Sequence, residues 1–268
     1  MTTLATMNAQ AKVNLRKSTI GEVNLEQGTL TATVANQRIR VSDGSLKAAD
    51  TMLTIRGDIG TDLKQQGKLD YQLRVGNLSP WLALIDHEGS GALVLVGQAQ
   101  GNFSDLKARG KITASSLIYR ETAVQRASVD YDLGYSSVRP LPYGTVNLSL
   151  SDVGNGYRLQ TIAGVVRIPS EVANLIELNV KARDAQGRTH TVTGNVKYQP
   201  ELLVAQLTQL SLDLPNGLWR LSQPVTVTQQ GPDFMVDRFS MRNNSSQLLL
   251  DGRFSLAGSQ ALRLDIEG

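Results

Sequence analysis

Apolar and polar residues alternate along most of this chain of 268 residues. In residues 69–75, for example, Leu69, Tyr71, Leu73 and Val75 are separated by single polar residues. Because successive side chains of a β-strand point to opposite faces, this period of two predicts strands with one apolar and one solvated face. The same pattern recurs in residues 129–133, 146–150, 176–182 and 262–266. We therefore expect an all-β fold.

Short clusters of Gly, Asn, Asp and Ser separate the alternating segments, as in Ser42-Asp43-Gly44. These residue types tolerate the positive φ angles of tight turns. Tight turns join strands that are neighbours in an antiparallel sheet. The spacing of the clusters therefore predicts a long meander of strands.

Residues 79–87 do not alternate, and they predict one short helix. Ser79 is a suitable N-cap residue, and Pro80 suits the first helical position, where no backbone N–H is needed. Trp81, Leu82 and Ile85 would form an apolar stripe on this helix.

The composition excludes several kinds of chemistry. Without cysteine there are no disulfides, thiolate nucleophiles or cysteine-based metal sites. Two histidines, His87 and His190, are too few for a three-histidine metal site. Neither a G-x-S-x-G elbow nor a P-loop occurs. The net charge of +3 is spread along the chain, whereas nucleic-acid binding needs a clustered basic surface. We expect no catalytic site, no cofactor, no metal and no nucleic-acid partner.

One pair of carboxylates could still carry chemistry. Asp130 and Asp132 alternate on one strand face, about 7 Å apart at ~3.3 Å per residue. Paired carboxylates can bind a cation or act as an acid and a base. No third acidic residue is near them, and both flank apolar positions, so a solvated outer face is the simpler interpretation.

The ends of the chain resemble the middle of a domain. No stretch approaches the ~20 apolar residues of a membrane-spanning helix, and the first residues do not show the basic region and apolar run of a signal peptide. The last residues, 264–268, fall inside an alternating pattern. We expect an internal fragment of a larger protein, a single elongated unit over residues 1–268 with a sub-boundary near residues 151–170.

The apolar faces of the predicted strands must be buried against something. Sandwiches and small barrels usually fill thick cores with aromatic side chains, but aromatics are only 5% of this chain. A long sheet could instead curl around an apolar groove, in which each buried CH₂ of an acyl chain would gain about 0.8 kcal/mol. Periodicity alone does not separate a packed core from such a groove. The predicted lining of the groove is Leu69, Tyr71, Leu73, Val75, Val94, Val96, Val129, Leu133, Val146, Leu148, Leu150, Ile176, Leu178, Val180, Leu248 and Leu250.

Two groups of motifs point to a family. Residues 97–106 read G-Q-A-Q-G-N-F-S-D-L, and residues 110–117 read G-K-I-T-A-S-S-L. Further on, L-W-R-L-S-Q-P at 218–224 precedes L-L-L-D-G at 248–252. This pattern of strands bounded by glycines resembles the repeats of the AsmA-like superfamily, and of its TamB family in particular.

The resemblance implies a β-taco, which is a long curled antiparallel or mixed sheet with an apolar concave groove. It also implies a periplasmic location in Gram-negative bacteria, within a parent protein anchored in the inner membrane by a segment outside this chain. The expected role is to carry phospholipids between the inner and outer membranes, with acyl chains as the ligand. An Omp85-type outer-membrane protein, TamA-like, would be the partner through the parent protein.

Two other functions stay open. Exposed edges and an apolar face could bind nascent outer-membrane proteins or autotransporters by β-augmentation. The chain could also be a structural segment of a surface β-solenoid or adhesin. Co-purified phospholipid would favour lipid transport, captured peptide would favour the chaperone role, and a tightly filled interior would favour the structural role.

Overall fold

The chain consists mainly of β-strands in this computed structural model, which describes residues 8–255 and 261–267. It divides into two compact units, residues 1–157 and 158–268. Paired strands run antiparallel in both units, and one short helix, α1 (Ser79–Ala83), occurs among the described residues. The predicted all-β fold with an antiparallel sheet and one short helix is therefore confirmed.

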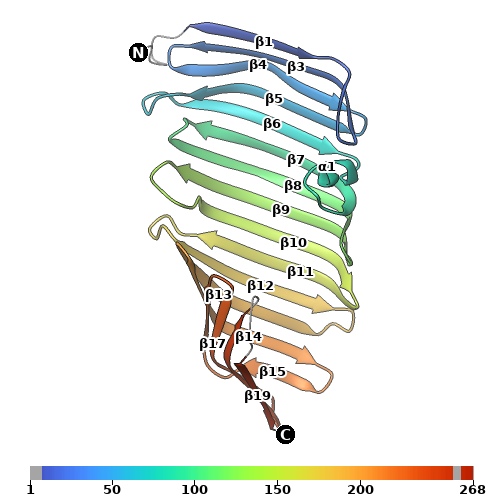
Figure 1. Cartoon of the computed structure of the whole chain (residues 1–268), viewed down its shortest axis with the longest axis vertical. Coiled ribbons are helices and arrows are strands. Elements are labelled where there is room, and N and C mark those ends of the chain that lie inside the picture. The colour runs from blue at the N-terminus through green and yellow to red at the C-terminus, as the bar shows by residue number, and fades with distance from the viewer. Residues whose placement is uncertain (1–7, 256–260, 268) are drawn as a thin grey trace. The chain divides into compact units, whose positions relative to one another are not determined.

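The sheet of unit 1 is a meander. Strands β1 and β2 both pair with β3, and from β3 to β10 each strand pairs with the next one along the chain (Figure 1). The strands are β1 (Ala9–Leu15), β2 (Ser18–Ile20), β3 (Val23–Ala35), β4 (Arg38–Ala48), β5 (Thr51–Gly60), β6 (Gly67–Val75), β7 (Gly89–Gly101), β8 (Asp105–Tyr119), β9 (Thr122–Ser136) and β10 (Tyr143–Asn155).

The turns explain why consecutive strands pair. Asn36 and Gln37 join β3 to β4, with φ angles of 50° and 58°. Two successive positive φ angles are typical of a type I′ hairpin turn, whose twist matches that of the flanking strands. Local turn geometry therefore fixes the antiparallel neighbour.

Unit 2 is built in the same way, with one interruption. One edge of β14 pairs with both β15 and β16, and these two strands pair in turn with β17. The strands are β11 (Tyr157–Ile168), β12 (Leu175–Asp184), β13 (Thr189–Gln199), β14 (Leu202–Leu214), β15 (Gly217–Leu221), β16 (Val225–Gln230), β17 (Asp233–Arg242), β18 (Gln247–Ser255) and β19 (Ala261–Glu267).

The predicted helix forms and begins at Ser79 as expected, but it ends at Ala83 and its N-cap differs from the prediction. Leu78, and not Ser79, is the N-cap residue, and no side chain caps the helix. Asn77 Oδ1 instead accepts a hydrogen bond of 3.0 Å from the backbone N–H of Ser79. Pro80 lies in the first turn as expected. Ile85 lies beyond the helix and is 62% exposed, so it does not join an apolar stripe.

Candidate functional site

One face of unit 1 is apolar from β4 to β10, and the strand register arranges its side chains in rows. Paired residues of antiparallel strands point to the same face of the sheet, so each row can be followed from strand to strand. We call the two middle rows the leucine row and the tyrosine row, and all four rows together the groove face. The leucine row contains Leu46, Leu53, Leu73, Leu95, Ile112, Val129 and Leu148.

The other rows follow from the same pairings. The tyrosine row contains Gly44, Ile55, Tyr71, Gly97, Gly110, Tyr131 and Val146. The row beyond it contains Val41, Gly57, Leu69, Ala99, Ala108, Leu133 and Gly144. The row on the far side of the leucine row contains Ala48, Thr51, Val75, Leu93, Ala114, Ala127 and Leu150.

The groove face carries no charged residue in these rows, whereas the opposite face is charged. On the opposite face Gln98 donates a hydrogen bond of 2.8 Å to Asp70. Lys111 Nζ lies 3.4 Å from Asp130 Oδ1, and both of these side chains are more than half exposed. The two faces therefore differ in chemistry as the alternating sequence requires.

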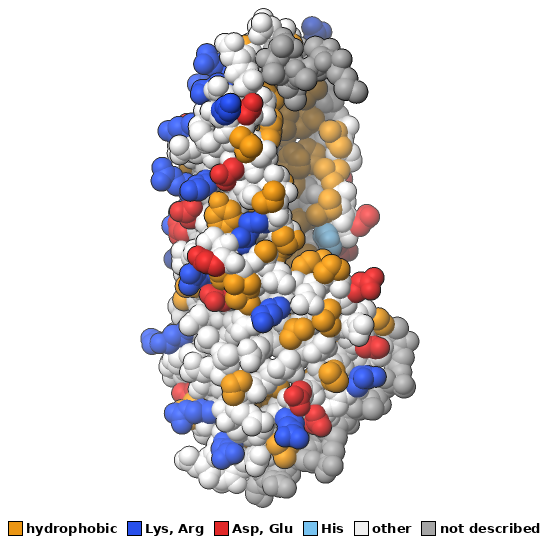
Figure 2. All heavy atoms as spheres, turned by 90° about the vertical axis from the view of Figure 1, so that its left-hand side faces the viewer, with side chains coloured by type: hydrophobic (Ala, Val, Ile, Leu, Met, Phe, Trp, Pro, Cys, Tyr) orange, Lys and Arg blue, Asp and Glu red, His pale blue; other side chains and the backbone are white. Residues whose placement is uncertain are grey.

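The groove face is neither filled nor fully exposed. Every residue of the leucine row is half-buried. Figure 2 shows a hollow in the part of the molecule that belongs to unit 1, with hydrophobic side chains on its wall. The extensive contacts of unit 1 join strands that are close neighbours in the sheet. A two-layer sandwich would bury these side chains completely against a second sheet, so the half-buried leucine row is not covered by one.

The insertion that contains α1 covers one margin of this face. Trp81 packs against a small buried cluster of Val23, Leu25 and Ala48. Its indole Nε1–H donates a hydrogen bond of 2.9 Å to Thr51 Oγ1. This contact satisfies the polar group of a large side chain that would otherwise lie on an apolar surface.

Two tyrosines lie over two glycines in the tyrosine row. The hydroxyl oxygens of Tyr71 and Tyr131 are 2.7 Å apart, and Gly97 and Gly110 occupy the two strands between them. A Cβ atom added at Gly97 would lie 2.6 Å from the Tyr71 ring. Burial, followed by the hydrogen bond to Tyr71, raises the pKa of Tyr131 above its ordinary value, so its phenol keeps its proton at neutral pH.

The register places most of the predicted lining residues of unit 1 on the groove face. Those residues are Leu69, Tyr71, Leu73, Val75, Val129, Leu133, Val146, Leu148 and Leu150.

Two predicted lining residues lie on the opposite face. Val94 is paired with Arg74, and Val96 is paired with Gln72 and Lys111. Val96 is also 50% exposed. The prediction that they share a face with Leu69 is therefore wrong. The run from Ala92 to Val96 is continuously apolar, so the run itself does not show which of its residues point to which face of the sheet.

Sequence reasoning missed Leu93 and Leu95, which take the places of those two valines on the groove face. A usable signal lies a few residues further on. In Gly97-Gln98-Ala99 the small residues alternate with polar ones, and the small residues belong to the apolar side. Counting back by twos from Gly97 reaches Leu95 and Leu93.

The predicted lining residues of unit 2 share an apolar face of their own. Ile176, Leu178 and Val180 are paired with Val196, Gly194 and Val192. Leu248 and Leu250 are paired with Met241 and Phe239.

The apolar face of unit 2 also contains a polar group. His190 is paired with Ala182 on one side and with Leu212 on the other. Its Nε2 lies 4.0 Å from Oδ2 of Asp184, a fully buried residue that also pairs with Arg188 Nε at 2.6 Å. The apolar face of unit 2 is therefore less uniform than the groove face.

Other candidate residues lie apart from one another. His87 Nδ1 is 3.2 Å from the Tyr119 hydroxyl, and Asp130 pairs with Lys111 on the charged face. Across the described ranges no group of three or more His, Cys, Asp or Glu residues could hold a metal ion.

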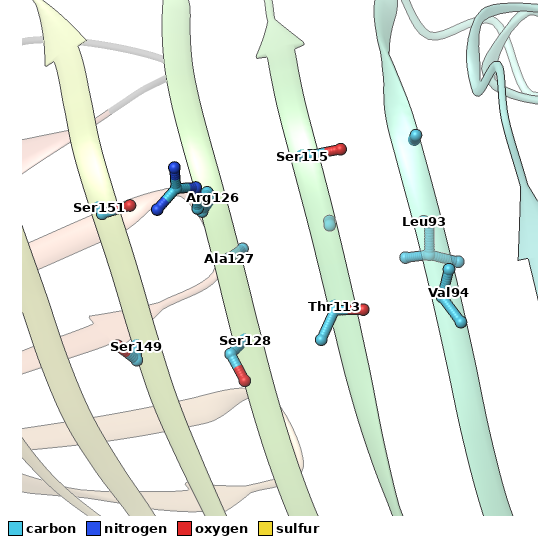
Figure 3. Close-up of a pocket in the computed structure, with 11 residues that line it drawn as sticks. Leu93, Val94, Thr113, Ser115, Arg126, Ala127, Ser128, Ser149 and Ser151 are labelled. Atoms are coloured by element: carbon cyan, nitrogen blue, oxygen red, sulfur yellow. The ribbon is translucent and has the colours of Figure 1, made fainter.

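A shallow depression of about 450 Å³ crosses β7 to β10. Ser115, Ser128 and Ser149 line it together with Arg126 (Figure 3). Asn147, the neighbour of Leu148, pairs with Asp130 of the charged face, and Ser149 pairs with Ser128. Thr113, Ser128 and Ser149 belong to the charged face, whereas Leu93, Ala114 and Ala127 belong to the groove-face rows, so the depression combines hydroxyl groups with apolar side chains.

Residues 10–268 match the family described as TamB, N-terminal domain. No curated protein matches the chain, and neither does any solved structure. No helix among residues 8–255 and 261–267 is long and apolar enough to cross a membrane.

Proposed function

The chain belongs to the TamB family, and from that premise we propose that its groove face carries the acyl chains of phospholipids across the periplasm. One observation supports the proposal most directly. Four adjoining rows of side chains cross from β4 to β10 without a charge and without a second layer that fills the space above them.

Such a surface suits acyl chains because apolar burial is not directional. Each CH₂ group removed from water contributes about 0.8 kcal/mol wherever it lies along the face. A chain can therefore move along the rows without breaking specific bonds. The predicted lining residues of unit 2 would offer acyl chains a separate apolar surface of the same kind.

The wider setting is part of the same proposal. As a member of the TamB family, the chain is a protein of the Gram-negative envelope. We propose that the parent protein is anchored in the inner membrane, bridges to the outer membrane and meets an Omp85-type, TamA-like partner there.

A pair of adjacent residues gives a matched test. Leu95 points to the groove face, and its neighbour Val96 points to the opposite face. A photo-crosslinking amino acid at position 95, in the parent protein in its own cells, should capture phospholipid. The same amino acid at position 96 should not. Equal capture at both positions, or no capture at position 95, would argue against a lipid groove.

A second function is favoured by the edge of unit 1. Strand β1 pairs with β3 on one side, and its residues from Gln10 to Leu15 are exposed. An exposed edge can accept another strand through backbone hydrogen bonds. Binding of outer-membrane protein strands at β1 is the competing proposal, and crosslinks from β1 to peptide in place of lipid would support it.

A further inference from the structure

The Tyr71–Tyr131 pair is the main polar feature of the groove face. Apart from these two hydroxyls, Thr51 is the one polar side chain in the four rows. Thr51 lies in the row furthest from the tyrosine row, and its hydroxyl already accepts the Trp81 N–H. The tyrosine hydroxyls therefore stand in wholly aliphatic surroundings, with the leucine row on one side and Leu69, Ala99, Ala108 and Leu133 on the other.

The sheet holds both rings in place. Gly97 and Gly110 carry no side chains, so the rings of Tyr71 and Tyr131 can extend toward each other over these two strands. A Cβ atom at Gly97 would be 2.5 Å from the Tyr131 hydroxyl. The glycines thus leave the space that the two phenols occupy, and the hydroxyls meet at 2.7 Å.

The pair leaves one hydrogen-bond donor unused. Each phenol has one O–H donor and can also accept. One hydroxyl donates to the other, so one phenolic hydrogen remains, and neither hydroxyl makes a further hydrogen bond to the part of the chain that the structure describes. Water can accept this hydrogen while the groove is open. A ligand that displaces the water must supply an acceptor, because an unmade hydrogen bond in apolar surroundings is costly.

We propose that the Tyr71–Tyr131 pair binds the acyl-ester carbonyl of a diacyl lipid and so selects ester-linked lipids within the groove. This inference rests on the proposed function. A carbonyl oxygen is an uncharged acceptor located where the acyl chains begin. A phosphate is a poorer match, because no cationic side chain lies in the four rows to offset the loss of its hydration.

The test compares two lipids that differ only at the ester. The purified protein is equilibrated with equal amounts of dioleoyl phosphatidylglycerol and its dialkyl ether analogue, and the bound lipids are quantified by mass spectrometry. An ether oxygen is a weaker acceptor than a carbonyl. We expect the wild-type protein to retain the ester lipid roughly three- to tenfold over the ether lipid, as one net neutral hydrogen bond allows.

A double variant, Tyr71→Phe with Tyr131→Phe, keeps both rings and removes both hydroxyls. It should lose affinity for the ester lipid and retain the two lipids at a ratio near one. Tyr135→Phe is the matched control, because Tyr135 lies on the same strand and is 46% exposed, and it should keep the wild-type ratio. A ratio of bound ester lipid to ether lipid near one in the wild-type protein would overturn the ester site while leaving the groove intact. An unchanged preference for the ester lipid in the double variant would do the same. Failure of the wild-type protein to bind either lipid would overturn the proposed function as well.

A second measurement does not depend on the double variant folding. In the complex of wild-type protein with ester lipid, the infrared band of the ester carbonyl should show a component at lower wavenumber than for the same lipid in hexane, as a hydrogen-bonded carbonyl does. A carbonyl band unchanged from that in hexane would overturn the ester site.

Discussion

The hydroxyl oxygens of Tyr71 and Tyr131 lie 2.7 Å apart, although strands β7 and β8 separate the strands that carry them. Three strand spacings of about 4.8 Å would place their backbones roughly 14 Å apart in a flat sheet. The contact therefore depends on two long side chains that lie along the sheet and on glycines at both positions beneath them. Any side chain at Gly97 or Gly110 would compete with the tyrosines for this space.

Replacing Gly110 by alanine should destabilise unit 1. The new Cβ would lie 2.5 Å from the Val96 carbonyl oxygen and 2.8 Å from the Gly97 Cα, and backbone atoms cannot easily move away. We expect a loss of about 1–3 kcal/mol in the free energy of unfolding, as for overpacked sites, measured by urea denaturation. Gly154→Ala is the control, because nothing lies within 4 Å of its added Cβ. An equal loss in both variants would show that general strand effects, and not this close approach, are responsible.

The Tyr131 phenol should make stability sensitive to alkaline pH. Burial, and then the hydrogen bond to Tyr71, raises the pKa of Tyr131 above its ordinary value of 10.0. The folded state then holds the proton more tightly than the unfolded state. This contribution to stability is complete below pH 10.0 and is lost as the pH rises above that value.

The measurement is the free energy of unfolding of wild type and Tyr131→Phe at several pH values. We expect the free energy of unfolding of the wild type to fall relative to that of Tyr131→Phe as the pH rises above about 10, by at most about 1.4 kcal/mol per pH unit. The shift should be smaller than this limit, because the half-buried ring is partly solvated. A difference that stays constant with pH would contradict the prediction.

The fold could be predicted because its main signal is local. Alternation in residues 69–75 and 146–150 identified β6 and β10 and the face to which their side chains point. The face to which each side chain of β7 points could not be predicted in the same way, because both faces are apolar from Ala92 to Val96. Only the pairing with β6, which places Leu95 opposite Leu73, shows that Leu95 points to the groove face.

The tyrosine pair could not be predicted from the sequence at all. Tyr71 and Tyr131 are 60 residues apart, and their contact depends on the register of three successive strand pairs. A shift of one residue in any pair would send one hydroxyl to the other face. The capping of α1 was predicted wrongly for a different reason, since Asn77 and Ser79 are both suitable polar residues and sequence alone does not say which one makes the hydrogen bond.

Removing Trp81 should loosen the margin of the groove face that α1 covers. Trp81→Ala loses the packing on Val23, Leu25 and Ala48 and the hydrogen bond to Thr51. We expect a loss of about 2–3 kcal/mol in the free energy of unfolding, below the range for fully buried tryptophans because the ring is only partly buried. Trp81→Phe should lose about 1 kcal/mol, mainly from the hydrogen bond. Ile85→Ala is the control within the same insertion, because this side chain is 62% exposed, and a loss as large as that of Trp81→Ala would contradict the packing argument.

A charge on the groove face should block lipid movement in the parent protein. Leu148→Asp places a carboxylate in the leucine row, where an acyl chain would have to pass an ion that prefers water. Leu178→Arg does the same on the apolar face of unit 2. We expect both variants to stop phospholipid transfer between the two membranes, followed by pulse-labelling of lipids in cells, while circular dichroism shows the sheet still folded.

Two neighbouring residues provide the controls for these charges. Asn147→Asp and Asn179→Arg add the same charges one residue away, on the opposite faces, where Asn147 pairs with Asp130 and Asn179 pairs with Val165 and Thr193. Both control variants should transfer lipid at the wild-type rate. Because each pair differs in face and not in charge, normal transfer in Leu148→Asp would show that lipid does not travel along the leucine row. Equal loss in Asn147→Asp would show that net charge, and not the apolar surface, limits transfer.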